Sequence, residues 1–217
     1  MRGGQAFLNV GRCRIDPTAD ICAGAVLGKN YRPLIGFSSV PESTSEETVI
    51  GPKVYVGYYT VIGAGSVVEE GSIVDDFSIV ECDVVIGQRT LVTYRAQICN
   101  DAQIGRNCVI GALIGERVKV GMGCRIFGEI IHAQHNPQIE WDAPEAQEGA
   151  AVIGDNAFVG FRAVVVGAVR LGAGAYVCAG AIVTRDVPPG HIVSGVNKIV
   201  SPKEWRGVLG GSGFFGR

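Results

Sequence analysis

The chain has 217 residues, of which 47% are hydrophobic, so it is long and apolar enough to form one domain with a buried core. Its net charge of −2 and its pI of about 5.9 exclude a general electrostatic attraction to nucleic acid or to an anionic membrane surface. Glycine is frequent, with 32 residues, and aromatic residues make up only 7%. This composition favours narrow coils with tight turns over a broad sandwich core.

The N-terminal segment contains no sustained apolar run, so we expect no signal peptide. No stretch approaches the roughly 20 apolar residues of a membrane span. The seven cysteines include no Cys-x-x-Cys pair, which favours buried, reduced thiols. We therefore expect a cytoplasmic protein without nucleic-acid or membrane partners.

A weak periodic pattern opens the chain. Aliphatic residues recur every six positions at Ile15, Ile21 and Leu27, and small residues precede the last two at Ala19 and Ala25. We expect this stretch to form a first coil.

Residues 28–49 then break the pattern with two prolines and a run of Ser, Thr and Glu. A loop of this length inside a repeat fold is usually functional or disordered. Tyr31 and Arg32 are therefore candidates for substrate contact.

The strongest pattern covers residues 50–110, where every sixth residue is aliphatic without exception: Ile50, Val56, Ile62, Val68, Val74, Val80, Ile86, Val92, Ile98, Ile104 and Ile110. Four places after each aliphatic residue comes a smaller one: Val54, Thr60, Ser66, Ser72, Ser78, Val84, Thr90, Ala96, Ala102 and Cys108.

A period of six suits extended backbone because it is a multiple of the strand period of two and not of the helix period of 3.6. Three hexads would close one triangular coil, with a turn after each short strand. Stacked coils would bury their aliphatic residues in columns, with neighbouring strands about 4.8 Å apart.

In this pattern the sequence resembles the hexapeptide-repeat superfamily, which implies an all-β fold, the left-handed parallel β-helix. The handedness follows only from the resemblance, since parallel crossovers are otherwise nearly always right-handed.

After residue 110 the register slips by two places, to Ile114, Val120 and Ile126, so that the next position in phase is His132. Residues 133–152 carry no repeat. The pattern resumes at Ile153 and continues every six residues to Val183. We count about seven triangular coils, or a prism of about 35 Å.

The C-terminal segment ends the pattern with Pro188 and Pro189, which stop strand pairing. Residues 201–205 could start a short capping helix, because serine before proline is a reasonable N-terminal signal. We expect a single domain over residues 1–205, with insertions at 28–49 and 133–152, followed by a flexible tail at 206–217.

The second half carries a more specific resemblance. The histidine-bearing loop, Ile-Gly-Asp-Asn-Ala-Phe-Val-Gly at 153–160 and Ala-Gly-Ala-Ile-Val-Thr-Arg-Asp-Val-Pro-Pro-Gly at 179–190 are similar to the C-terminal half of the hexapeptide acyltransferases, which include sugar, serine and xenobiotic acetyltransferases. The resemblance implies a homotrimer, acyl-CoA as co-substrate in the groove between neighbouring prisms, and a loop histidine as general base.

Two histidines are candidates for this base. His135 lies in the segment His135-Asn136-Pro137, which is similar to a His-x-Pro segment of the family, and His132 interrupts the aliphatic column just before the loop. A neutral histidine with a pKa near 6.5 suits proton removal from an acceptor at neutral pH. Glu129, Glu140 or Asp142 could orient the ring.

For CoA, the resemblance points to Gly160, Ala163, Ala179, Gly180 and Lys198. Small residues would let a pantetheine arm approach the backbone, and the lysine could meet a phosphate. Trp141 and Asp142 would shape the acceptor site together with Tyr31 and Arg32. No metal is required.

The expected function is transfer of an acetyl or related acyl group from acyl-CoA to an amine or hydroxyl of a small polar acceptor, such as a sugar, an amino acid or a natural-product intermediate. One alternative is a non-catalytic scaffold or small-molecule binding protein, because fold does not imply function. Another is a transferase with a non-CoA donor. A γ-class carbonic anhydrase is disfavoured because no third histidine precedes the loop to complete a zinc site.

Overall fold

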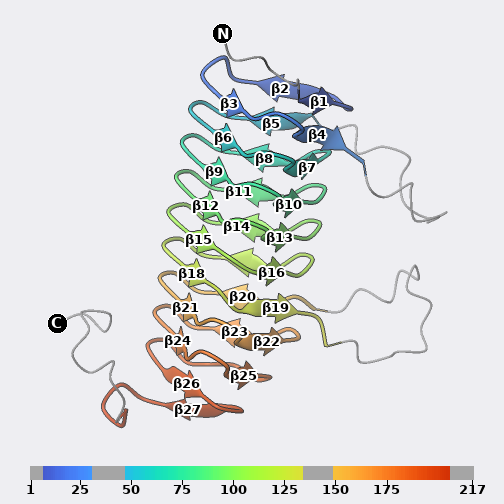
Figure 1. The fold of residues 1–217 in the computed structure, drawn as a ribbon. Helices are drawn as coiled ribbons and strands as arrows, with labels where there is room; N and C mark the ends of the chain where they lie inside the picture. Colours follow the sequence, from blue (N-terminus) through green and yellow to red (C-terminus); the bar gives the residue numbers. More distant parts are fainter. Residues whose placement is uncertain (1–6, 31–46, 134–148, 206–217) are drawn as a thin grey trace, which may run out of the picture.

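The computed structural model describes residues 7–30, 47–133 and 149–205. Within them, each strand pairs with the third strand before it and the third strand after it, so the chain visits three sheets in turn. The coils stack as a triangular prism (Figure 1). All pairings are parallel apart from the last one, between β26 and β27. The fold is the predicted left-handed parallel β-helix.

The three faces of the prism are called sheets A, B and C. Sheet A contains β1 (Leu8–Asn9), β4 (Val26–Lys29), β7 (Val61–Gly63), β10 (Ile79–Val80), β13 (Gln97–Ile98), β16 (Leu113–Ile114), β19 (Glu129–Ile131), β22 (Val164–Val166) and β25 (Ile182–Val183). Sheet B contains β2 (Cys13–Ile15), β5 (Thr48–Ile50), β8 (Val67–Val68), β11 (Val85–Ile86), β14 (Gln103–Ile104), β17 (Lys119–Val120), β20 (Val152–Ile153) and β23 (Arg170–Leu171). Sheet C contains β3 (Asp20–Ile21), β6 (Tyr55–Val56), β9 (Ile73–Val74), β12 (Leu91–Val92), β15 (Val109–Ile110), β18 (Arg125–Ile126), β21 (Phe158–Val159), β24 (Tyr176–Val177), β26 (Ile192–Ser194) and β27 (Lys198–Val200).

The core is the aliphatic column that the hexads predict. All eleven aliphatic residues from Ile50 to Ile110 are between 0 and 2% exposed, because the second residue of each two-residue strand points into the prism. Burying such a side chain contributes about 1.5–3 kcal/mol. The aliphatic columns therefore hold the coils in register.

The small residues before each strand are also buried, and where they are polar they bond to the next coil. Ser72 Oγ donates to the carbonyl of Gly87 (2.9 Å) and accepts from the backbone N–H of Thr90 (3.2 Å). The Cys108 thiol donates to the carbonyl of Gly121 in the same way (3.1 Å). The hydroxyls thus satisfy backbone groups at the corners that the sheets leave without partners.

Three edges join the sheets, and each edge is named by the sheets it connects. The AB edge is exemplified by residues 81–84, the BC edge by 87–90 and the CA edge by 75–78. At the third residue of each four-residue corner from 51 to 163, φ is positive, with values from 53° to 62° at the non-glycine residues. These conformations cost about 1–3 kcal/mol each and persist because the stacked coils fix them.

Two consecutive corners on the CA edge are short. Ile79 pairs with Gln97, 18 residues on, whereas Gln97 pairs with Leu113 and Ile114 with Ile130, each 16 residues on. Residues 111–112 and 127–128 therefore turn the chain with two residues in place of four. The second short corner makes Ile130, fully buried, the next inward residue after Ile126. The prediction that position 132 is in phase was wrong for this reason.

The prism is longer than predicted. Sheet A has nine strands among the described residues, or about 38 Å at strand spacing, in place of about seven coils. The difference comes from β1, which precedes the first recognisable hexad, and from the coils around the short corners. Residues 201–205 form one hydrogen-bonded turn where a short helix was predicted, with Ser201 Oγ bonded to Glu204 Oε2 (2.8 Å). The described part of the chain contains no helix of the length and apolarity that a bilayer crossing demands.

Candidate functional site on two edges of the prism

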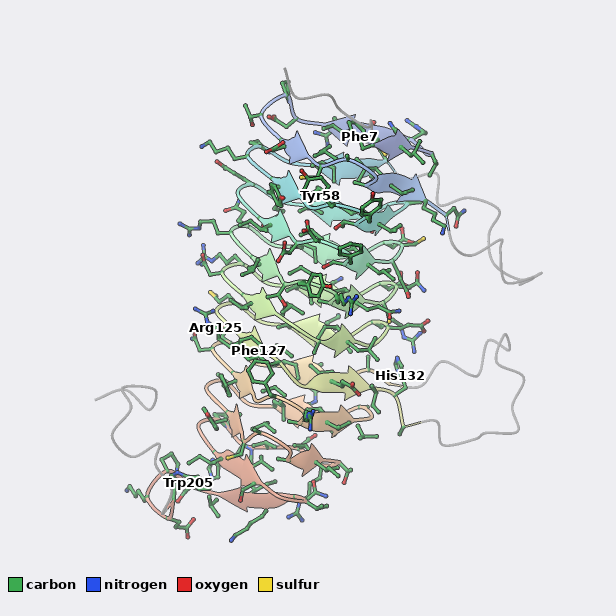
Figure 2. All side chains as sticks on the ribbon, viewed as in Figure 1. Phe7, Tyr58, Arg125, Phe127, His132 and Trp205 are labelled. Carbon is green, nitrogen blue, oxygen red and sulfur yellow. The ribbon has the colours of Figure 1, made fainter. Side chains whose placement is uncertain are left out.

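His132 lies directly after β19, where the chain leaves sheet A at the AB edge (Figure 2). Its Nε2 atom is buried and has no hydrogen-bond partner among the described residues. The ring lies over Gly115, since a Cβ added there would be 3.6 Å from both Nε2 and Cδ2 of the histidine. The same Cβ would be 2.9 Å from the Ile130 carbonyl oxygen, so the backbone of the next coil, and not the imidazole, requires glycine at 115. Buried polar atoms without a hydrogen-bond partner are uncommon in a stable fold, so His132 Nε2 is a candidate to contact a ligand.

A polar cluster continues along the AB edge toward the N-terminus. Glu81 accepts hydrogen bonds from Gln97 Nε2 (2.9 Å) and from the backbone N–H of Asn100 (3.1 Å). Burial, and then Glu81 and Glu116, raise the pKa of the Cys99 thiol to about 12, so this thiol stays protonated at neutral pH. Sequence reasoning missed this cluster, although Glu81, Asn100 and Glu116 all lie in corners that follow sheet A strands.

Glu129 is the first residue of β19 and is exposed, whereas the next residue, Ile130, points into the prism. Its side chain therefore projects from the outer face of sheet A. The structure places Glu129 at the start of β19 and His132 just after its end, and no hydrogen bond joins the carboxylate to His132 Nε2.

The residues predicted to bind CoA lie elsewhere. Gly160, Ala179 and Gly180 belong to successive corners of the CA edge. A Cβ added to Gly160 would be 2.6 Å from the Ala179 nitrogen, so the next coil itself requires glycine there. Gly180 has a φ of +70° and open space around it. Ala163 is fully buried in the core, and Lys198 is exposed on β27.

Histidine and CoA candidates therefore occupy two different edges, at opposite ends of the sheet A strands. Figure 2 shows this separation, with His132 on one side of the prism and Phe127, of the CA edge, on the other. A single chain does not bring them together.

The remaining candidates, His135, Glu140, Trp141, Asp142, Tyr31 and Arg32, lie outside the described residues. The segments that contain them connect β4 to β5 and β19 to β20, so both leave sheet A at the AB edge (Figure 1). β4 and β19 are five strands apart in sheet A, or about 24 Å. Within the described residues, no three His, Cys, Asp or Glu side chains gather in a way that could hold a metal ion.

Comparison with known proteins matches residues 97–127 and 151–185 to the family model described as the hexapeptide repeat of succinyl-transferase. Among curated proteins, 2,3,4,5-tetrahydropyridine-2,6-dicarboxylate N-acetyltransferases from Staphylococcus aureus strains are 40% identical over 81 residues, 37% of this chain. The chain spans only 28% of the length of these relatives.

Solved structures with a similar arrangement include the Arabidopsis UDP-N-acetylglucosamine acyltransferase, at 15% identity and a TM-score of 0.49, over 89% of this chain and 74% of that one. Another is the GDP-perosamine N-acetyl transferase from Caulobacter crescentus in complex with CoA and GDP-perosamine, at 17% identity and a TM-score of 0.32, over 87% and 57%. The chain carries hexapeptide repeats on a left-handed parallel β-helix, and its predicted resemblance to the hexapeptide-repeat superfamily is confirmed.

Proposed function

We propose that the protein is an acyltransferase that moves an acetyl or related acyl group from acyl-CoA to an amine or hydroxyl of a small polar acceptor. The observation that carries this proposal is the buried Nε2 of His132, which has no hydrogen-bond partner in the part of the chain that the structure describes. It lies in the gap between the two stretches that match the hexapeptide repeat of succinyl-transferase, 97–127 and 151–185. The sequence similarity to N-acetyltransferases supports the same reaction class.

The reaction needs only two kinds of group from the protein, a general base and a hydrogen-bond donor for the oxyanion. A neutral imidazole, from His132 or His135, removes the proton of the acceptor as its nitrogen or oxygen attacks the thioester carbonyl. The new bond to the acyl carbon forms, the carbon–sulfur bond breaks, and the proton passes to the CoA thiolate. A backbone N–H would stabilise the oxyanion that develops meanwhile.

The acceptor would be bound by residues of the two AB-edge insertions, with Tyr31, Arg32, Trp141 and Asp142 as its contacts. The names of the related proteins suggest two acceptor classes to test, a cyclic amino dicarboxylate and a nucleotide-linked amino sugar. Arginine suits both, because its guanidinium binds carboxylate and phosphate in a bidentate manner.

A complete site would need a second copy of the chain, because His132 and the Gly160 corner lie on different edges. We therefore propose a homotrimer in which the AB edge of one copy faces the CA edge of its neighbour, with the CoA between them and Lys198 near its phosphates. None of the seven cysteines forms a disulfide, which fits a cytoplasmic protein, where thiols stay reduced.

The test is thiol release from acetyl-CoA and from succinyl-CoA in the presence of a panel of amino dicarboxylates and nucleotide-linked amino sugars. We expect turnover with at least one pair. His132→Asn and His135→Asn should be compared singly and together, because both are candidates for the base. The variant that lacks the base should lose about 10²- to 10⁴-fold in kcat.

Circular dichroism of each variant is the control for folding, since asparagine keeps the size and polarity of the side chain. Unchanged turnover in the folded double variant would exclude a histidine base. The absence of thiol release with every pair, in a protein that also fails to bind CoA, would exclude the acyltransferase function.

A further inference from the structure

The third edge of the prism, the BC edge, has no part in the function proposed above. His132 lies on the AB edge, and the Gly160 corner belongs to the CA edge. Figure 2 shows Arg125, which opens β18 beside the BC edge, on the side of the prism opposite to His132. The central coils of this edge carry a group of cationic side chains, although the whole chain has a net charge of −2.

Arg106 and Arg125 reach across the same two coils in opposite directions. Arg106 Nη2 lies 3.7 Å from Met122 Sδ, in the next coil. Arg125 Nη1 donates to the Asn107 carbonyl, in the coil before (3.3 Å), and lies 3.5 Å from the Cys124 carbonyl. Both arginines are exposed. Their guanidinium groups therefore lie over the same pair of corners, 105–108 and 121–124, where their like charges repel each other.

The described residues provide no acidic partner for this pair. Neither arginine forms an ion pair with a carboxylate of the described residues. A thioether is a weak acceptor, and the two carbonyls share one nitrogen of Arg125, so these contacts use few of the five N–H donors of each guanidinium. The next corner carries one carboxylate, Asp155, but its Oδ1 accepts a hydrogen bond from the Met122 N–H (2.9 Å).

Polar residues interrupt an apolar row on each face beside this edge. On the outer face of sheet C, the paired first residues of the strands from β6 to β24 are Tyr55, Ile73, Leu91, Val109, Arg125, Phe158 and Tyr176. On sheet B, the corresponding row is Val49, Val67, Val85, Gln103, Lys119 and Val152. Both interruptions fall on the same two coils. The repeat accepts apolar residues at these positions, so the cations answer a local requirement and not one of the fold.

A shallow hollow of about 350 Å³ adjoins the cations on sheet B. Gln103 and Lys119 line it, together with Gly105 and Gly121, the first residues of the two corners. Arg106 follows Gly105 in the chain, and its guanidinium contacts the residue that follows Gly121. Lys119 therefore lies in the hollow, and Arg106 lies at its rim.

We propose that Lys119, Arg106 and Arg125 form a binding site for a phosphate monoester, with the phosphate at the cations and the rest of a small molecule in the hollow beside Gln103. The planar fork of arginine matches two phosphate oxygens. A phosphate dianion neutralises two of the three positive charges, whereas a single carboxylate neutralises one. The site goes beyond the proposed transfer reaction and does not depend on it.

The experiment is calorimetric titration of the full chain with glycerol 3-phosphate at low salt concentration. Arg106→Gln, Arg125→Gln and Lys119→Gln should each weaken binding by about 10- to 100-fold, the range expected for loss of a charge-assisted hydrogen bond. Each should also reduce the dependence of binding on salt concentration. Arg170→Gln is the matched control and should bind like the unaltered protein, because Arg170 is exposed in the same row of sheet B but two coils from Lys119.

Thermal denaturation provides a second measurement. Without ligand, the double variant Arg106→Gln/Arg125→Gln should be at least as stable as the unaltered protein, because the repulsion between the two guanidinium groups is removed. Glycerol 3-phosphate should raise the Tm of the unaltered protein and leave that of the double variant unchanged.

Failure of the unaltered protein to bind glycerol 3-phosphate would overturn the inference. A loss of affinity in Arg170→Gln as large as that in Arg125→Gln would also overturn it, since binding would then be a general attraction to cations. Malate carries the same charge on two carboxylates, and tighter binding of malate would overturn the assignment to phosphate. None of these measurements involves thiol release, so failure of this site and failure of the proposed function are separate outcomes.

Discussion

The small residues in the corners form hydrogen bonds in addition to fitting the limited space. The hexads require a small residue before each strand. At Ser66, Ser72 and Thr90 the structure adds a second requirement, a hydroxyl that both donates a hydrogen bond to the next coil and accepts one from it. The sequence pattern predicts that the side chain at this position must be small, but it does not predict the hydrogen bonds. The preference for serine and threonine is therefore explained only by the backbone groups of the neighbouring coil.

Ser72 offers a direct test of this role. Ser72→Ala keeps the size of the side chain but leaves the Gly87 carbonyl and the Thr90 N–H without their partner, so we expect a loss of about 1–3 kcal/mol in the free energy of unfolding. Urea denaturation measures this loss. Ser72→Thr is the matched control and should be nearly neutral, because threonine occupies the same position at Thr60 and Thr90. Equal stability of the two variants would show that only size matters.

At the scale of the strands and corners, the repeat predicts almost everything between residues 50 and 110. Strict spacing fixes which residue of each strand is buried, because one shift by a single residue would expose the whole column. The spacing fails at the CA edge, where two corners lose two residues each. The first short corner can be read from the sequence, because Ile114 follows Ile110 after four positions and not six. The second cannot, because the insertion after Ile131 interrupts the hexads that would have identified Ile130 as the inward-pointing residue.

The second short corner depends on Gly128. A Cβ there would lie 2.5 Å from the Ala163 carbonyl oxygen and 2.7 Å from that of Gly160, both backbone atoms that cannot move alone. Gly128→Ala should therefore destabilise the fold by about 3 kcal/mol and separate β19 from β22. Gly174→Ala is the matched control, because its Cβ would meet nothing within 4 Å and only its positive φ opposes the change, at about 1 kcal/mol.

Thermal denaturation of both glycine variants compares these costs. A change in stability at Gly128 no larger than that at Gly174 would mean that the coil relaxes around the methyl group. Because His132 follows β19, we also expect the Gly128 variant to lose activity before it unfolds.

At the scale of the whole molecule, the fold could be predicted from the sequence, whereas the relation between the candidate residues could not. Gly160 and His132 are 28 positions apart in the sequence, with an insertion between them. Whether they meet depends on which edge each corner occupies, and the two short corners and the insertion obscure that count. His135 and Trp141 stay predictions, since they lie outside the described residues.

The separation of the edges gives a test of the proposed assembly. A variant with both His132→Asn and His135→Asn lacks the base, and Ala179→Trp fills the open corner of the CA edge. Each should be inactive alone. If each site combines edges of two copies, refolding the two variants together in equal amounts should restore about a quarter of the activity, because random mixing leaves that fraction of sites with two intact edges.

Thiol release from acyl-CoA measures the restored activity, and each variant refolded by itself is the control. A mixture that stays as inactive as its components would place both edges of one site on the same chain and contradict the proposed arrangement.

The pairing of β27 with β26 has a consequence for the length of the molecule. A stack of identical coils has no natural end, since the last coil offers the next one the same row of free backbone groups that it received from the coil before. β27 runs antiparallel to β26 and breaks this translational symmetry on sheet C. A coil of another molecule arriving at this face would meet a strand of the wrong direction. We therefore expect the hairpin to hinder end-to-end pairing of molecules through sheet C.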